Sequence, residues 1–221
     1  MSSQTYLLFS TGPVPVAGGM QLTDQMCSAG AQPGWVGHVS VDDVDASAKK
    51  AVELGGSVHV APSDIPGVGR FSMIADPQGA VVSMFTPLPT YPQGARPPSE
   101  PGYPGWRELL AADWEKAFDF YSALFGWTKD KAIDLGPMGT YQLLNTGDPP
   151  AGGAMFNKPA DIPHPFWLYY FYVESIAAGA ERVKAGGGKI LMGPHQVPGD
   201  SWIAQCMDPQ GAMFALVALK P

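Results

Sequence analysis

Residues 62–85 read PSDIPGVGRFSMIADPQGAVVSMF, and residues 194–217 read PHQVPGDSWIAQCMDPQGAMFALV, at a constant offset of 132. The same five residues, DPQGA, begin at Asp76 in the first stretch and at Asp208 in the second. A long match without gaps is typical of a duplicated structural unit, here of about a hundred residues per copy. The sequence therefore predicts a repeated fold.

The match continues towards the start of the chain. Residues 34–56 align with residues 166–188 at the same offset, and TYLLFSTGPVPVAGGM (5–20) resembles TYQLLNTGDPPAGGAM (140–155). The second copy has a long segment before this stretch, whereas the first begins almost at Met1. We therefore expect the first copy to lack its opening strand and helix. Because such a gap would expose apolar surface, the sequence favours a shortened chain over a gap covered by another subunit or segment.

A proline-rich segment separates the two copies. TPLPTYPQGARPPSEPGYPG (86–105) contains seven prolines in twenty residues, a composition typical of a stiff, extended linker. The predicted organisation is a first domain over 1–87, a linker over 88–103 and a second domain over 104–221.

The periodicity of the second copy indicates short helices among many short strands. Asp113 precedes an apolar helix face as a predicted N-cap. That face consists of Trp114, Ala117, Phe118, Tyr121, Leu124 and Phe125. Helices are predicted over 43–54, 114–125 and 175–185. In the second copy, strands are predicted near 105–111, 131–134, 140–145, 152–156, 167–173, 189–192, 201–207 and 212–219. The fold class is therefore α+β, with strand–helix–three-strand units, helices outside and a sheet that curls around a hollow.

Composition excludes several classes of partner. The net charge of −7 argues against a nucleic-acid backbone or an anionic membrane. No apolar stretch approaches the length of a membrane-spanning helix, and the start does not resemble a secretory signal. Cys27 and Cys206 lie far apart in sequence, and we expect buried or half-buried free thiols in a cytoplasmic protein.

Three sequence features together resemble a known family. They are D113-x4-F118-Y-x3-L124-F-G-W127, the block V41-D-D-V-D-A-S-A-x6-L-G-G56 with its relative at 173–188, and the DPQG used twice before a final strand. In order and spacing they resemble the vicinal oxygen chelate superfamily of glyoxalase I, bleomycin-resistance proteins and extradiol dioxygenases. The resemblance covers nearly the whole chain. It implies tandem glyoxalase-like domains, each built of paired βαβββ modules that form a cupped, eight-stranded half-barrel.

The resemblance also implies where a divalent metal would be bound. Carried over position by position, the ligand positions are Trp106, Leu168 and Ala215 in the second domain. Those visible in the first domain are Val36 and Ser83. None is His, Asp, Glu or Cys, the residues that supply most protein ligands to such metals. We therefore expect no metal and no cofactor in either domain.

Large and aromatic residues occupy these positions instead. Strand alternation predicts that Trp106, Glu108, Leu168, Tyr170, Tyr172 and Ala215 face the second hollow. Such a lining favours an apolar small-molecule site, although side chains that simply fill the hollow would give the same pattern. In the first domain, His38 and Ser83 face the corresponding hollow.

Glu108 is also a candidate for catalysis, and Arg70 and Trp202 are further candidates for ligand binding. A carboxylic acid in an apolar hollow is suited to act as a general acid or base, which makes Glu108 the candidate catalytic residue; the alternative is a structural carboxylate that caps a backbone or pairs with an arginine. Arg70 lies where members of the family can hold an anionic ligand, and Trp202 is its counterpart in the second copy. The two domains would then bind different groups.

These observations lead to three hypotheses for the function. The first is a metal-independent protein that binds a small aromatic or apolar molecule. The second is an enzyme of the superfamily, a lyase, isomerase or hydroxylase-like catalyst that uses acid–base chemistry. The third is a structural or regulatory module whose hollows are filled. A homodimer is a further possibility that the sequence leaves open.

Overall fold

A computed structural model of the chain describes residues 6–12, 14–90, 100–147 and 152–221. The first copy contains β1 (Tyr6–Thr11), β2 (Val14–Met20), α1 (Asp24–Ser28), β3 (His38–Ser40), α2 (Val44–Glu53), β4 (Ser57–Ile65), β5 (Gly69–Ala75) and β6 (Val81–Pro87). The second copy begins with β7 (Pro104–Ala111), α3 (Trp114–Phe125), β8 (Thr128–Asp134), the short 3₁₀ helix η1 (Gly136–Met138), β9 (Thr140–Asn145) and β10 (Gly152–Asn157). It ends with β11 (Phe166–Tyr172), α4 (Ile176–Ala185), β12 (Lys189–Gln196), β13 (Trp202–Met207) and β14 (Met213–Ala218).

The element order confirms the α+β class and the repeated strand–helix–three-strand unit. We call residues 38–87 module 2, residues 104–157 module 3 and residues 166–218 module 4. The β1–β2 hairpin matches the β9–β10 hairpin of module 3, and no strand or helix precedes it within the described residues. Residues 91–99 of the proline-rich segment lie outside the described residues, and the predicted domain limits stay predictions.

The chain forms two compact units that do not coincide with the two sequence copies. Unit 1 contains residues 1–35, 94–106 and 169–221, and unit 2 contains residues 36–93 and 107–168. Unit 2 therefore combines module 2 with most of module 3, whereas unit 1 combines the β1–β2 hairpin with most of module 4.

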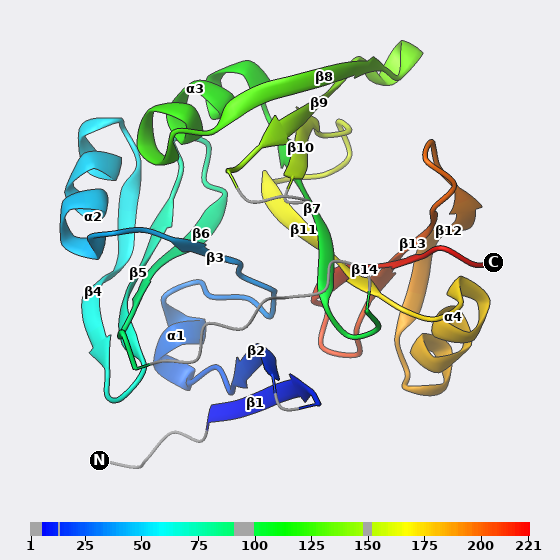
Figure 1. Cartoon of the computed structure of the whole chain (residues 1–221), viewed down its shortest axis with the longest axis horizontal. Helices are drawn as coiled ribbons and strands as arrows, with labels where there is room; N and C mark the ends of the chain where they lie inside the picture. Colours follow the sequence, from blue (N-terminus) through cyan, green and yellow to red (C-terminus); the bar gives the residue numbers. More distant parts are fainter. Residues whose placement is uncertain (1–5, 13, 91–99, 148–151) are drawn as a thin grey trace. The chain divides into compact units, whose positions relative to one another are not determined.

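Unit 2 contains the strands of module 2 and most of those of module 3. Module 2 has the strand order β3-β6-β5-β4, and module 3 has the order β7-β10-β9-β8 (Figure 1). In module 2, α2 begins after its N-cap Asp43, whose side chain accepts a hydrogen bond from the amide of Ala46. Its buried residues Val44, Ala48 and Ala51 follow the i, i+4, i+7 spacing of one helix face.

Helix α3 confirms the predicted N-cap and most of the predicted buried face, to which Phe120 is added. Asp113 caps the helix through the amide of Lys116, and Gly126 ends it in the left-handed conformation, with φ of 75°. The buried residues are Ala117, Phe120, Tyr121 and Leu124. Sequence periodicity missed Phe120, because this ring packs against Gly56 of module 2, a contact that no local pattern encodes.

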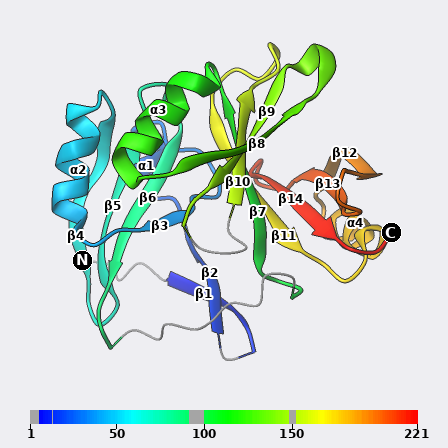
Figure 2. The same cartoon turned by 45° about the horizontal axis from the view of Figure 1, so that its top comes forward.

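In unit 1, the sheet of module 4 has the order β12-β13-β14-β11, and α4 lies beside β13 and β14 (Figure 2). Ser175 caps α4, and its hydroxyl accepts a hydrogen bond from the amide of Ala178. The helix packs over a small apolar core formed by Ile176, Ala204, Cys206, Leu216 and Ala218.

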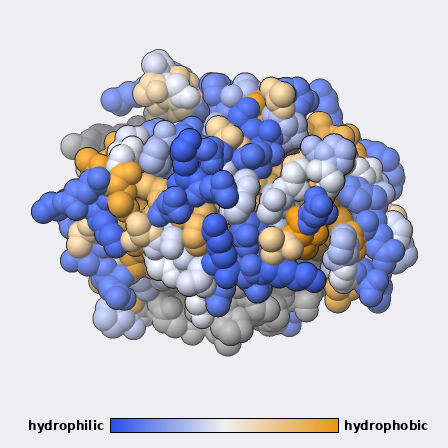
Figure 3. Space-filling model, turned by 90° about the horizontal axis from the view of Figure 1, so that it is seen from above, coloured by the Kyte–Doolittle hydropathy of each residue, from blue (hydrophilic) through white to orange (hydrophobic). Residues whose placement is uncertain are grey.

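Both cysteines are free, as expected, but Cys27 is exposed on the short helix α1 instead of buried or half-buried. Cys206 is fully buried, and burial raises the pKa of its thiol to about 11. No helix among the described residues is long and apolar enough to cross a membrane. Hydrophilic residues dominate the face of the molecule in Figure 3, on which hydrophobic residues form separate patches.

Candidate functional site

The predicted site residues fall in both units. Unit 1 carries Trp106, Tyr170, Tyr172, Trp202 and Ala215. Unit 2 carries His38, Arg70, Ser83, Glu108 and Leu168.

In unit 2, Glu108 is a buried carboxylate with a specific partner. It lies on β7 with 5% of its surface exposed, and its Oε2 accepts a hydrogen bond of 2.8 Å from the Tyr141 hydroxyl on β9. A buried carboxylate normally needs such a partner, because removing a charge from water without compensation is costly. We call these two residues the Glu108–Tyr141 pair.

The rest of this sheet face is apolar. The register places Ala154 of β10 beside Glu108, and the ring of Tyr141 lies 5.5 Å from that of Phe156. Strand alternation directs Arg107 to the opposite face, where its guanidinium donates a hydrogen bond of 3.0 Å to the Thr146 hydroxyl. The pair presents one polar acceptor next to two aromatic rings.

In unit 1, three strands bring Gln205, Ala215 and Tyr170 into one row. Ala215 pairs with Gln205 on one side and with Tyr170 on the other. The Gln205 amide donates a hydrogen bond of 3.3 Å to the Tyr170 hydroxyl, and it crosses the small Ala215 side chain to do so. The ring of Tyr172, two residues further along β11, lies directly over Gly105, where an added Cβ would be 1.9 Å from the ring.

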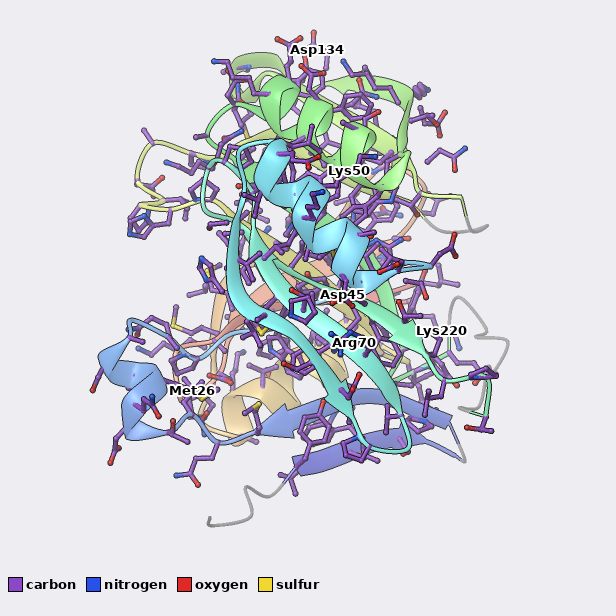
Figure 4. The ribbon with its side chains drawn as sticks, turned by 90° about the vertical axis from the view of Figure 1, so that its left-hand side faces the viewer. Met26, Asp45, Lys50, Arg70, Asp134 and Lys220 are labelled. Atoms are coloured by element: carbon purple, nitrogen blue, oxygen red, sulfur yellow. The ribbon has the colours of Figure 1, made fainter. Side chains whose placement is uncertain are left out.

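Trp202 and Arg70 do not join these rows. Trp202 packs against the apolar core under α4, on the opposite face from Gln205, because residues 202 and 205 differ by an odd number along β13. Arg70 lies on the α2 side of module 2, and Figure 4 shows it beside Asp45. Trp202 and its counterpart Arg70 therefore both face the helix of their own module.

The guanidinium of Arg70 is held by two carboxylates. Its Nε and Nη2 donate to the two oxygens of Asp45 at 2.6 and 2.9 Å, and its Nη1 donates to Asp64 at 2.8 Å. The Arg70 hydrogen bonds lower the pKa of Asp45, and the two carboxylates raise the pKa of Arg70. An anionic ligand at Arg70 would have to compete with both aspartates, and that role stays a prediction.

The predicted pair in the first domain, His38 and Ser83, lies side by side on β3 and β6. Ser83 is fully buried, and its hydroxyl donates a hydrogen bond of 3.2 Å to the carbonyl of Ser72. His38 is exposed, with its ring 5.8 Å from that of Phe85. The serine is therefore engaged in the sheet, and the histidine is the accessible member of the two.

The positions at which the resemblance places metal ligands do not fit a metal ion. Leu168 and Ala215 are completely buried, and neither side chain has a donor atom. Trp106 donates through its indole nitrogen but has no lone pair to coordinate a cation. Among the described residues, no three His, Cys, Asp or Glu side chains gather closely enough to hold a metal ion. Glu108, the nearest carboxylate along β7, is bonded to Tyr141.

Tyr141, Phe156 and Gln205 are site residues that the sequence analysis missed. Alternation within residues 140–145 places Tyr141 and Leu143 on one face, but the identity of that face depends on pairing with β10 and β7. That pairing joins residues 33 positions apart in the case of Glu108 and Tyr141. The repeated TY at the start of both matched stretches was the available signal.

A second buried carboxylate, Asp76, lies in the DPQG turn of module 2. Its Oδ1 accepts hydrogen bonds from the amides of Gln78 and Ala80, whereas its Oδ2 is buried without a hydrogen-bond partner in the described residues. Burial raises the pKa of Asp76, and the two amides and the nearby Tyr121 hydroxyl oppose that rise. This carboxylate belongs to the interface between α3 and module 2.

Comparison with known proteins identifies the family to which this chain belongs. A model described as the Glyoxalase/Bleomycin resistance protein/Dioxygenase superfamily matches residues 105–216. "Putative glyoxylase CFP32" of Mycobacterium tuberculosis is 35% identical over 192 residues, which cover 87% of this chain and 71% of that protein. "Anthracycline biosynthesis protein DnrV" of Streptomyces peucetius is 32% identical over 187 residues, 84% of this chain and 66% of that protein.

Two solved structures share the fold at low sequence identity. The 2,2',3-trihydroxybiphenyl 1,2-dioxygenase of Sphingomonas wittichii gives a TM-score of 0.58 at 16% identity, over 85% of this chain and 71% of that one. The Mn(II)-bound glyoxalase of Novosphingobium aromaticivorans gives a TM-score of 0.57 at 17% identity, over 83% of this chain and 62% of that one. Such likeness concerns the fold, and the residues of the site have to be read from this chain itself.

Proposed function

Because this chain belongs to the glyoxalase/bleomycin resistance protein/dioxygenase superfamily, we propose a function from the chemistry of its own residues: it binds a small aromatic or apolar molecule without a metal ion. The observation that carries this proposal is the Glu108–Tyr141 pair, a buried carboxylate on an otherwise apolar, aromatic sheet face. Small-molecule sites are typically apolar surfaces with a few well-placed polar groups.

The pair supplies the polar group that such a site needs. Tyr141 donates to one oxygen of Glu108 and thereby holds the carboxylate in one orientation. A carboxylate has further lone pairs, so it can accept a second hydrogen bond from a ligand hydroxyl or amine. The rings of Tyr141 and Phe156 offer an apolar surface on which a flat ligand can pack. A hydroxylated aromatic compound satisfies both requirements.

Metal independence rests on the residues at the ligand positions of the family. Leu168 and Ala215 offer no donor atom there, and the Gln205–Tyr170 hydrogen bond spans Ala215. The relatives named as anthracycline biosynthesis proteins support the proposed ligand class, because anthracyclines are fused aromatic ring systems that carry hydroxyl groups.

The test measures binding of 1,4-dihydroxyanthraquinone, a hydroxylated polycyclic probe, by thermal shift and fluorescence quenching. We expect saturable binding that falls about tenfold in Glu108→Gln, since a hydrogen bond to a charged acceptor contributes about 1.5–3 kcal/mol. Tyr141→Phe should weaken binding less, because the carboxylate stays. Glu53→Gln, a change of the same type on the exposed side of α2, is the matched control. Binding that is equal in all four proteins would contradict the role of the pair, and no binding would favour filled hollows.

A metal measurement tests the other half of the proposal. The purified protein is incubated with Ni, Zn, Mn and Fe, desalted and analysed by mass spectrometry. Less than about a tenth of an equivalent agrees with the residues at the ligand positions, and nearly one equivalent would overturn metal independence.

An enzymatic role is the second candidate, and the burial of Glu108 favours it. A buried carboxyl group that holds a hydrogen bond from a tyrosine can exchange a proton with a bound substrate. Product formation from a bound compound that is lost in Glu108→Gln, with binding retained, would select the enzyme over the binding protein.

A further inference from the structure

Unit 1 contains a cavity of about 670 Å³ on the α4 side of module 4. Aromatic and aliphatic residues, among them Trp35, Phe171, Tyr172, Phe214 and Leu216, form most of its walls. The exposed Arg182 lies at the edge, and two acidic residues, Glu174 and Asp208, complete the charged part of the lining. Trp35 packs on Phe171, with ring centroids 4.9 Å apart. The cavity faces away from the row of Gln205, Ala215 and Tyr170, since Phe214 and Leu216 alternate with Ala215 on β14.

The equivalent place in unit 2 is filled by a tyrosine from α3. At the offset of 132, Trp35 corresponds to Trp167 and Asp208 corresponds to Asp76. In unit 2, the Tyr121 hydroxyl accepts a hydrogen bond of 3.0 Å from the Trp167 indole, and the two rings lie 5.4 Å apart. The same hydroxyl lies near the Asp76 carboxylate and lowers its pKa. Tyr121 therefore fills the space between two residues whose equivalents line the cavity of unit 1.

The equivalent glycines Gly56 and Gly188 show the same difference between the two units. An added Cβ at Gly56 would lie 2.8 Å from the carbonyl of Ala75 and 3.1 Å from the ring of Phe120. An added Cβ at Gly188 would lie 2.8 Å from the carbonyl of Met207 and 2.9 Å from the side chain of Val183 on α4, with no aromatic ring among its nearest neighbours. The two backbones are alike, and the ring that α3 contributes is present at the first glycine alone.

The third difference concerns the glutamine of the DPQG turn. The Gln78 amide donates to the carbonyl of Asp113 at 2.8 Å and accepts from its amide nitrogen at 2.8 Å, so it holds the N-cap of α3 by two reciprocal bonds. Gln210 occupies the equivalent position in module 4 and is exposed. Module 4 therefore carries the docking groups that module 2 uses.

We propose that this cavity, with Gln210 beside it, is a docking site for a helix with the chemistry of α3. The occupant is an amphipathic helix of another polypeptide segment, with the pattern Asp-x6-Phe-Tyr-x2-Leu that Asp113, Phe120, Tyr121 and Leu124 show in α3. Its N-cap backbone pairs with Gln210, its phenylalanine packs on Val183 beside Gly188, and its tyrosine lies between Trp35 and Asp208. The chain's own α3 already covers module 2 and is not available for this site.

The test places such a helix next to the cavity. In the second copy, residues 104–139 immediately precede Thr140, which is the equivalent of Thr5 in the first copy. We therefore design an extended chain in which a second copy of residues 104–139 immediately precedes Thr5. Thiol labelling follows Arg182→Cys at the cavity edge, in a chain whose exposed Cys27 is changed to Ser. Lys184→Cys, exposed on the same helix and outside the cavity lining, is the matched control.

We expect the added segment to slow labelling at position 182 by about tenfold or more and to leave position 184 unchanged, because docking buries the cavity edge. The protection should disappear when the Tyr121 and Phe120 equivalents of the added copy are changed to Ala. Equal labelling with and without the added segment would overturn the proposal. Protection that rises with the concentration of the unmodified chain would overturn it too, in favour of a second copy as the occupant.

A peptide of residues 112–127 added in trans keeps the proposal testable if the extended chain does not fold. Saturable slowing of labelling at position 182, absent with a Tyr121→Ala peptide, supports the docking site. No slowing at millimolar peptide would count against it.

Discussion

The chain uses the turn DPQGA twice, and the two turns have different surroundings. In both, the aspartate Oδ1 accepts hydrogen bonds from the amides two and four residues later, at 2.8–3.0 Å. Around Asp76 this turn lies under α3, and the aspartate is 3% exposed. Around Asp208 it borders the cavity of unit 1, and the aspartate is half-buried. Equal local sequence therefore gives equal local hydrogen bonds, whereas burial depends on the element packed above.

This difference in burial shows which residues of the repeat contact a covering helix. Where a helix covers the module, the repeat positions Trp167, Asp76 and Gln78 are all in contact with it. Where no such helix lies among the described residues of unit 1, their equivalents Trp35 and Asp208 line a cavity. Substitutions at equivalent positions should therefore have unequal effects on stability.

The largest inequality is expected between the two tryptophans. Trp167→Ala removes a ring that is 6% exposed and that contacts Tyr121 and Trp127, with centroids 5.4 and 5.9 Å away. We expect a loss of about 3–5 kcal/mol in the free energy of unfolding, as for buried Trp→Ala changes generally. Trp35→Ala removes a half-buried ring that packs on Phe171, and it should cost about 1–2 kcal/mol.

Urea unfolding followed by circular dichroism measures both tryptophan variants against the unmodified chain. Hydrogen exchange within residues 117–124 assigns the loss to unit 2. Equal losses at both positions would mean that Trp35 is covered as completely as Trp167, which would remove the basis of the comparison.

The two glutamines give a smaller contrast. Gln78→Ala breaks two hydrogen bonds to the Asp113 backbone, each of which contributes about 0.5–1.5 kcal/mol, so a loss of about 1–3 kcal/mol is expected. Gln210→Ala changes an exposed side chain and should stay within about 0.5 kcal/mol of the unmodified chain. Chemical unfolding of both variants under one set of conditions is the measurement. A Gln210→Ala loss as large as that of Gln78→Ala would show that module 4 is already docked through this residue.

Much of the fold was predictable from local sequence, because its signals are local. Asp113 before an apolar period of 3.6 predicted α3, and the constant offset of 132 predicted that module 4 would repeat module 2. The buried face of α3 was predicted only in part. Phe120 is buried by Gly56, which lies in the other copy and leaves no trace in the periodicity of the helix.

The site was less predictable for the same reason. The sequence indicated that Glu108 would be buried on an apolar face, but its partner Tyr141 follows from the register of three strands. The resemblance placed Arg70 where an anionic ligand can be held, whereas in the structure its guanidinium is bound by Asp45 and Asp64, 25 and 6 residues away. Trp202 shares its face with Ala204 and Cys206, since these residues alternate along β13, and this spacing is visible in the sequence.

The smallest effect, and the one specific to the covered turn, is a pH dependence at Asp76. Burial raises the pKa of this carboxyl above its ordinary value of 3.8 in the folded state. The folded protein therefore takes up this proton at a higher pH than the unfolded chain. Between pH 3.8 and the raised folded pKa, the contribution of Asp76 to stability falls as the pH rises, and above that window the ionised carboxylate is a constant cost.

Asp76→Asn removes this titration and keeps an oxygen for the two turn amides. The free energy of unfolding of the unmodified chain, minus that of the variant, should therefore increase as the pH is lowered from 7 towards 4. Asp45 and Asp113 act in the opposite sense, because the hydrogen bonds from Arg70 and Lys116 lower the pKa of each. Asp45 and Asp113 are present in the unmodified chain and in the Asp76→Asn variant, so their contributions cancel when the two free energies of unfolding are subtracted. A difference that stays constant across this range would mean that the covered turn leaves Asp76 no harder to ionise than in the unfolded chain.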